Sequence, residues 1–198
     1  MQQFDLTDPG EKKVEYLDLE RAISFMRRVT SVVKVLQTID GHEKGKDYGY
    51  CALASSFDRR ILLSFQFGKC PSGKPSVYDS FSREKVRRLY VHAKRDGHIS
   101  SWQSRNEQMK QYGGAVLAHR AGLILSASSM PELEDEALML VSGYSEGIMT
   151  IQEILDVAKT SDNKIFYALY TAYCKPMRYA NLSSSSNPVC VAPSPLTD

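Results

Sequence analysis

Histidine residues are the first candidates for chemistry in this sequence, because a neutral imidazole can bind a metal ion or the iron of haem. His119 stands at the end of an apolar stretch, next to Arg120, and is the candidate ligand for a metal or a haem. The alternative is that a histidine beside a turn is simply exposed to solvent. His92 and His98 are six residues apart, which is a poor spacing for two ligands on one helix. They form a metal pair only if the chain folds back after the helix, and His42, in a turn, carries no comparable signal.

Trp102 is the only tryptophan, and it stands in the polar stretch SSWQSRN. Its large ring can anchor this stretch in the core or cover a bound ligand, and both interpretations stay open. Arg105 and the neighbouring polar side chains would supply hydrogen bonds to such a ligand. Gly113 and Gly114 follow, where the backbone passes close to another group or takes a positive φ. These residues form a candidate binding region.

The segment from Arg83 to Arg95 holds six basic residues against one acid. A basic helix can bind phosphate groups or nucleic acid, but the solvent side of any amphipathic helix has the same composition. Because no series of stacking aromatics follows the charges, we do not expect nucleic acid. Residues 131–158 hold seven acids and no Lys or Arg. The two segments are complementary in charge, and they can meet within one chain or between two chains.

The sequence contains no common catalytic signature in the setting that its chemistry needs. Gly-x-Ser-x-Gly occurs once, as GYSEG at residues 143–147, but at the end of an expected helix and not at the strand-to-helix turn of a nucleophile elbow. The phosphate-binding loop that ends in Gly-Lys-Ser/Thr and the Gly-x-Gly-x-x-Gly fingerprint are absent from the sequence. Its four cysteines, at positions 51, 70, 174 and 190, lack the close spacing of a structural zinc site. Cys51 lies in an apolar run and is expected to be a small buried hydrophobe. The sequence therefore favours a binding protein over an enzyme.

Composition is that of an ordinary soluble protein, with 42% hydrophobic and 24% charged residues among 198. The net charge of +2 is too small to imply nucleic acid or a membrane surface as partner. The longest apolar runs are far below the roughly 20 residues that span a bilayer. The beginning of the sequence, polar and acidic after Met1, predicts no signal peptide. We therefore expect a cytoplasmic location and no disulfide framework.

One domain is expected over residues 16–180, with a core at 16–147 and a helical extension at 148–180. Residues 1–15 are a polar lead-in, and the Ser/Pro-rich tail at 181–198 is expected to be disordered. Hydrophobic periodicity and turn residues predict the elements inside the domain. The first half holds a helix that begins near Tyr16, is capped by Asp18 and ends before Gly41, then strands at 48–55 and 61–68 and a helix at 80–94. The second half holds a polar connection at 97–111, strands at 115–119 and 123–127, a helix that begins with the capping box Ser129-x-x-Glu132, a helix that begins with the capping box Thr150-x-x-Glu153, and an aromatic helix at 163–174.

This order of elements predicts an α+β fold with a profilin-like plan. Two hairpins separated by a helix give four antiparallel strands, and we expect the helices to pack against one face of the sheet. The aromatic helix carries more apolar side chains than one helix face needs, which predicts a homodimer or larger assembly. These side chains are Ile165, Phe166, Leu169, Tyr170 and Tyr173.

Three short motifs carry a resemblance to a known family: Lys85-Val86, Gly113-Gly114 and Asp135-Glu136-Ala137. Over about residues 18–147 the chain resembles the GlcG/HbpS family, whose domain also closes the PduO proteins. It departs from the family pattern where Ser128-Ser129 replaces a Ser-Gly and where Val86 replaces an Ala. The resemblance implies a small-molecule or haem-binding module that often self-associates and has no secure catalytic residues.

Two hypotheses of function follow. The first is a non-catalytic module that binds haem or a small organic ligand beside the second hairpin. The second is an adaptor or antagonist that acts through protein–protein contacts alone. For the first hypothesis the candidate ligand-binding residues are Lys85, Trp102, Arg105, Gly113, Gly114 and His119, with His119 also the candidate metal ligand.

Overall fold

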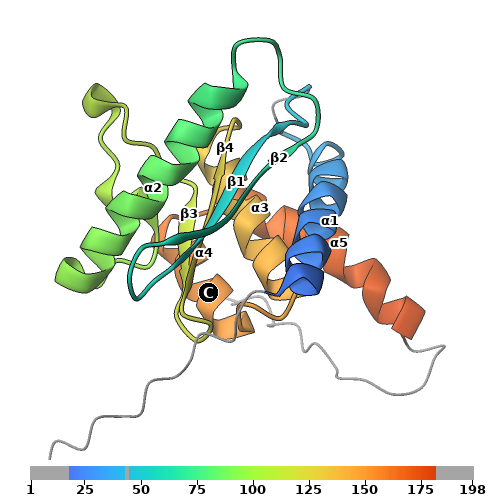
Figure 1. Cartoon of the computed structure of the whole chain (residues 1–198). Coiled ribbons are helices and arrows are strands. Elements are labelled where there is room, and N and C mark those ends of the chain that lie inside the picture. The colour runs from blue at the N-terminus through green and yellow to red at the C-terminus, as the bar shows by residue number, and fades with distance from the viewer. Residues whose placement is uncertain (1–17, 43–44, 182–198) are drawn as a thin grey trace, which may run out of the picture.

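The computed structural model describes residues 18–42 and 45–181 (Figure 1). The expected lead-in at 1–15 and nearly all of the expected tail lie outside these residues. The described helices and strands are α1 (Leu19–Leu36), β1 (Gly49–Ser55), β2 (Ile61–Phe67), α2 (Pro75–Asp96), the short 3-10 helices η1 (Ser101–Ser104) and η2 (Glu107–Met109), β3 (Ala115–Ala118), β4 (Leu123–Ser128), α3 (Glu132–Ser145), α4 (Ile151–Thr160) and α5 (Lys164–Asn181).

The four strands form one antiparallel sheet in the order β2-β1-β4-β3. Both predicted hairpins are present, and their long central strands pair with each other. Leu53 of β1 lies opposite Leu63 of β2 on one side and Leu125 of β4 on the other. Val116 of β3 lies opposite Leu125 in turn. The structure thus confirms an α+β fold with an antiparallel sheet and helices packed on it.

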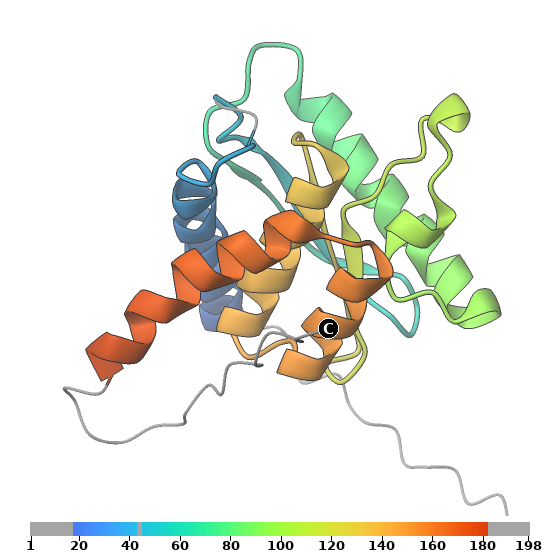
Figure 2. The same cartoon turned by 180° about the vertical axis from the view of Figure 1, so that it is seen from behind.

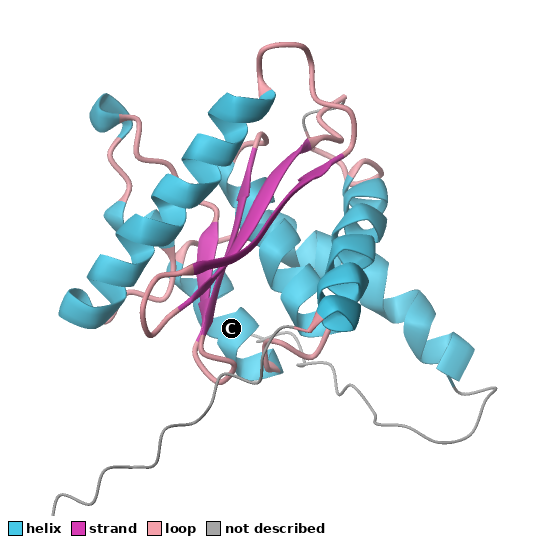
Figure 3. Ribbon diagram, in the orientation of Figure 1, coloured by secondary structure: helices cyan, strands magenta, loops and turns pink. Residues whose placement is uncertain are grey.

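Helices cover both faces of the sheet, so the expectation of one covered face is wrong (Figures 2 and 3). Successive strand residues point to opposite faces. Ala52 and Ile124 pack with Val86 and Leu89 of α2 on one face. The opposite face meets the apolar sides of α1, α3 and α5 in the larger core. The reason lies in β1 and β4, which are buried at almost every position, as strands covered on both sides must be.

Local capping sets several helix starts. The side chain of Asp18 accepts a hydrogen bond from the backbone N–H of Arg21 (2.7 Å), which confirms the predicted start of α1. Thr150 and Glu153 form the predicted capping box of α4. The capping box predicted at Ser129 is wrong: Pro131 stands at the start of α3, and the Ser129 hydroxyl donates to the Tyr48 carbonyl instead. A tertiary hydrogen bond has replaced a local one.

Three aromatic side chains of α5, Phe166, Tyr170 and Tyr173, pack against other elements of the same chain. Phe166, Leu169, Tyr170 and Tyr173 are buried against the core. The Tyr170 ring lies between the rings of Phe166 and Tyr144, at centroid distances of 5.7 and 5.6 Å. The surplus of apolar surface that suggested a dimer is therefore absent, and the homodimer stays a prediction without this support. Among the described residues, no helix is both long and apolar enough to cross a membrane.

Candidate functional site

A buried ion pair joins α2 to α3 beside the start of β3. Lys85 Nζ lies 2.9 Å from Asp135 Oδ2 and donates to the Ala127 carbonyl at 2.8 Å. The Lys85 and Asp135 side chains are only 3% and 1% exposed. Gly114 leaves the room for this pair, because a Cβ there would lie 2.6 Å from Asp135 Cβ and 2.9 Å from Lys85 Nζ. Its φ of +107° also disfavours any other residue.

Burial dominates the electrostatics of this pair. It raises the pKa of Asp135, while the Lys85 ammonium and backbone N–H donors such as that of Met130 act in the opposite direction. The neighbouring Cys51 is fully buried, and burial together with the Asp135 charge raises the pKa of its thiol well above the ordinary value. A protonated, enclosed thiol is a poor nucleophile. The structure thus brings the predicted residues Lys85 and Gly114 together, and their visible role is to tie α2, β4 and α3 together.

A second cluster lies next to this pair and reaches the surface. The guanidinium carbon of Arg105 stands 3.6 Å from the centroid of the Trp102 ring. A Cβ on Gly113 would lie 3.1 Å from Trp102 Cε3 and 3.3 Å from Glu132 Cβ, so Gly113 lets these two side chains approach. Glu132 Oε1 is enclosed and makes no hydrogen bond within the described part of the chain. We call Trp102, Arg105, Gly113 and Glu132 the Trp102 cluster.

Arg88 of α2 fixes the loop that carries the Trp102 cluster. Its Nη1 donates to the Ser101 carbonyl (2.9 Å) and to Ser104 Oγ (2.8 Å), and its Nη2 donates to the Tyr112 carbonyl. The same side chain is paired with Glu84, with Nε 2.8 Å from Oε1. One arginine therefore holds both ends of the loop. The pair with Glu84 is a local i,i+4 contact of the kind that the sequence predicts, whereas the loop partners lie 13 to 24 residues further along the chain and no local pattern indicates them.

A buried carboxylate, Glu136, supports the same loop from below. It accepts hydrogen bonds from the hydroxyls of Ser100 and Ser161 and from Asn163 Nδ2 (3.0 Å). Burial raises the pKa of Glu136, and these three hydrogen bonds oppose that change. In the sequence Glu136 is only one of the seven acids of residues 131–158 and the middle residue of Asp135-Glu136-Ala137. Its partners are 25 to 36 residues away, so no local pattern could have revealed them.

The histidines are distributed differently from what the sequence suggested. His119 is exposed at the tip of the second hairpin. It is five residues from Gly114 along an extended strand, about 16 Å at roughly 3.3 Å per residue. His42 is buried instead, with Nδ1 2.7 Å from Glu134 Oε2. His92 and His98 do come together, because the chain folds back after α2. Ligation by His119 stays a prediction, and it belongs to a different region from the Trp102 cluster.

The described side chains offer groups that can bind a ligand. Of the predicted ligand residues, the structure groups exposed Arg105 and half-buried Trp102 with buried Gly113, places Lys85 beside Gly114, and leaves His119 apart. Glu132 and Arg88 are the contributors that the sequence did not single out. No protein-family model matches the chain, and neither a curated protein nor a solved structure shows detectable similarity to it. The resemblance to the GlcG/HbpS family therefore stays a prediction.

Proposed function

We propose that the protein is a non-catalytic binding module that takes a small organic acid at the Trp102 cluster. The observation that carries the proposal is the stacking of Arg105 on Trp102 beside Glu132. A guanidinium that lies flat on an indole keeps its N–H groups along its edge, where they bind a carboxylate in two places. The enclosed Glu132 Oε1 lacks a partner among the described residues and would accept an N–H from the same ligand.

These two groups define the chemistry of the ligand. It carries a carboxylate for Arg105 and an N–H donor for Glu132, together with an apolar part that packs on Trp102. The binding residues are preorganised by Arg88 and by the capping hydrogen bonds of η1, where Gln103 Oε1 accepts from the N–H groups of Ile99 (2.8 Å) and Ser100 (3.1 Å). Preorganisation lowers the entropic cost of binding. We place this activity in the cytoplasm, in keeping with the free thiols of Cys51 and Cys70.

Haem is the less favoured ligand in this proposal. His119, its candidate axial ligand, is exposed and lies at the other end of β3 from the Trp102 cluster. Haem is nevertheless included in the test, because haemin gives an absorbance signal of its own. The adaptor hypothesis instead requires a protein partner at the same loop. In that case neither the organic acids nor haemin would raise the melting temperature of the protein.

The experiment is a stability screen of the full chain with amino acids, small carboxylic acids and haemin as probes. A ligand that binds the folded protein raises its melting temperature by mass action. We expect a carboxylate that bears an N–H donor to raise the melting temperature and to change Trp102 fluorescence. Arg105→Gln should weaken this ligand at least about tenfold, the loss of a charge-assisted pair, whereas Arg87→Gln, an exposed arginine on α2, should not. Equal affinity of wild type and Arg105→Gln would disprove the site, and a haemin Soret shift abolished by His119→Gln would favour haem.

A further inference from the structure

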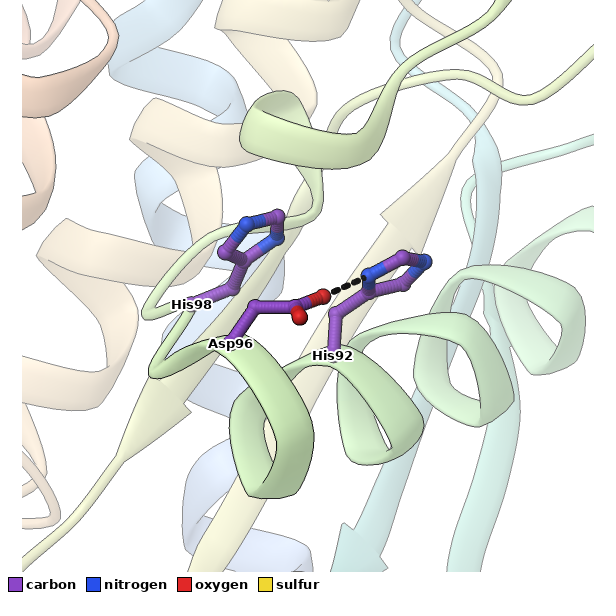
Figure 4. Close-up of side chains that lie close together, drawn as sticks. All are labelled: His92, Asp96 and His98. Carbon is purple, nitrogen blue, oxygen red and sulfur yellow. Dashed lines mark hydrogen bonds and ion pairs between the residues drawn. The ribbon is translucent and has the colours of Figure 1, made fainter.

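Three side chains with metal-binding atoms meet at the C-terminal end of α2: His92, Asp96 and His98 (Figure 4). One ligand atom from each lies within 4.8 Å of the others. His92 Nδ1 is 2.6 Å from Asp96 Oδ2. The two imidazole rings are stacked, with centroids 5.0 Å apart and planes inclined by 11°. The three side chains therefore already face one common region.

The backbone explains why residues six apart meet. Asp96 follows His92 by four residues, so both lie on the same face of α2. Gly97 then takes a left-handed conformation, with φ of 71°, and its N–H bonds to the His92 carbonyl. This turn reverses the chain and lays His98 against the last turn of the helix, with its own N–H also directed to the His92 carbonyl at 3.3 Å. The fold-back on which this histidine pair depended is present.

From this geometry we propose that His92, Asp96 and His98 bind a divalent first-row transition ion, of which Zn²⁺ is the probe. Two imidazoles and one carboxylate suit such ions, whereas Ca²⁺ and Mg²⁺ prefer sites made of oxygen alone. Three protein ligands leave the remaining coordination positions to water. His98 Nδ1 is enclosed and makes no hydrogen bond to another described residue, so it is available as a ligand.

The free site holds a positive charge of its own. Arg95 Nη2 lies 2.8 Å from Asp96 Oδ2 and 3.1 Å from His92 Nδ1. The ion must displace this guanidinium, whose side chain is 65% exposed and has room to move away. The stacked rings must also rotate, because each nitrogen lone pair lies in the plane of its own ring, and two stacked rings inclined by only 11° do not direct both lone pairs to one ion. We therefore expect weaker binding than at a closed structural zinc site.

The proposal is independent of the organic-acid site, although the two are close in sequence. His98 is four residues from Trp102 and precedes the Ile99 and Ser100 amides that cap η1. A metal bound at His98 would fix the base of this loop to α2. Trp102, the only tryptophan, can therefore report metal binding through its fluorescence.

The test is calorimetric titration of Zn²⁺ into the full chain without a histidine tag. The double variant His92→Gln/His98→Gln should lose at least about tenfold in affinity, and Asp96→Asn should lose a smaller factor. The matched control is His119→Gln, an exposed histidine that is not one of the three proposed ligands, which should bind like wild type. Arg95→Gln should bind more tightly, because it removes the competing cation.

Three results of the titration would contradict the metal site. Absence of Zn²⁺ binding to the wild type would overturn the proposal. So would equal loss in His119→Gln and in the double variant, or full competition by Mg²⁺ or Ca²⁺. Melting curves without metal establish that each variant is folded. A failure here would leave the carboxylate-binding test untouched, because that test uses Arg105 and no metal.

Discussion

At Lys85 one side chain joins a helix, a strand and a second helix. The sequence pointed to Lys85, Gly114 and Asp135 only through short motifs that resemble those of a family, and the physical reason for their association came from the structure. Gly114 is the residue without a Cβ that allows the ammonium and the carboxylate to meet. Local pattern can single out such residues, but it cannot show that the pair is 3% and 1% exposed and therefore closed to solvent.

Removing one member of this pair should be costly. Lys85→Met leaves the Asp135 carboxylate buried without its counter-charge, and we expect a loss of about 3–5 kcal/mol in the free energy of unfolding. Lys85→Met/Asp135→Asn should recover part of this loss, because no buried charge remains. Denaturant unfolding measures both variants. A loss below about 1 kcal/mol for Lys85→Met would show that solvent reaches Asp135 and would contradict the burial described here.

The contacts of other residues could not be predicted from the sequence either, because their partners are distant along the chain. His42 pairs with Glu134, 92 positions away, and it looked like a residue of no interest in a turn. His119 drew attention because it ends a strand beside a charge, yet it is exposed. The sequence predicted a pair between His92 and His98 only if the chain folds back after the helix. Gly97, which can take a left-handed conformation, was the residue that could have indicated this fold-back. Contacts between distant segments depend on how elements pack, which single residues do not encode.

At the scale of elements, the two hairpins were predicted to within one residue. Apolar runs bounded by turn residues determine such strands locally. The helix α2 begins at Pro75, five residues before its predicted start, because proline is well tolerated in a first turn. The covering of both sheet faces was missed, although the almost uniformly apolar β1 and β4 were consistent with it. An unbroken apolar run does not by itself separate a strand covered twice from one covered once.

The loop from Ser101 to Tyr112 should depend on Arg88. Arg88→Met keeps a long apolar stem on α2 but leaves the Ser101 and Tyr112 carbonyls without their donor. We expect faster hydrogen exchange across this loop and a red-shifted Trp102 emission, since the ring becomes more exposed to water. Arg87→Met, at an exposed position, should change neither signal. Unchanged exchange in Arg88→Met would mean that the Glu136 hydrogen bonds from below hold the loop alone.

At the scale of the whole molecule, the sequence overestimated the apolar surface left for partners. It treated α5 as one helix against one layer, whereas α5 packs on α1 and α3 behind a sheet that α2 covers from the other side. The charged segments also meet within the chain at Lys85 and Asp135. These contacts within the chain bury the apolar side chains and pair the charges from which a dimer was inferred. An assembly through α5 would therefore have to use the outer side of this helix, where Tyr167 is 46% exposed.

Phe166 and Tyr167 separate folding from assembly, because they are adjacent in α5 but differ in exposure, at 1% and 46%. Phe166 is 1% exposed, so Phe166→Asp buries an unpaired carboxylate and should abolish the cooperative thermal transition. Tyr167→Asp changes a half-exposed position but removes the edge-to-face contact with Phe166, whose ring centroid is 5.1 Å away. It should therefore lower the free energy of unfolding by only about 0.5–1.5 kcal/mol. Circular dichroism measures stability, and light scattering measures mass. If the wild type is a dimer and Tyr167→Asp is a folded monomer, the outer side of α5 is the interface. If Phe166→Asp stays folded and only loses mass, the packing of α5 against its own chain is wrong.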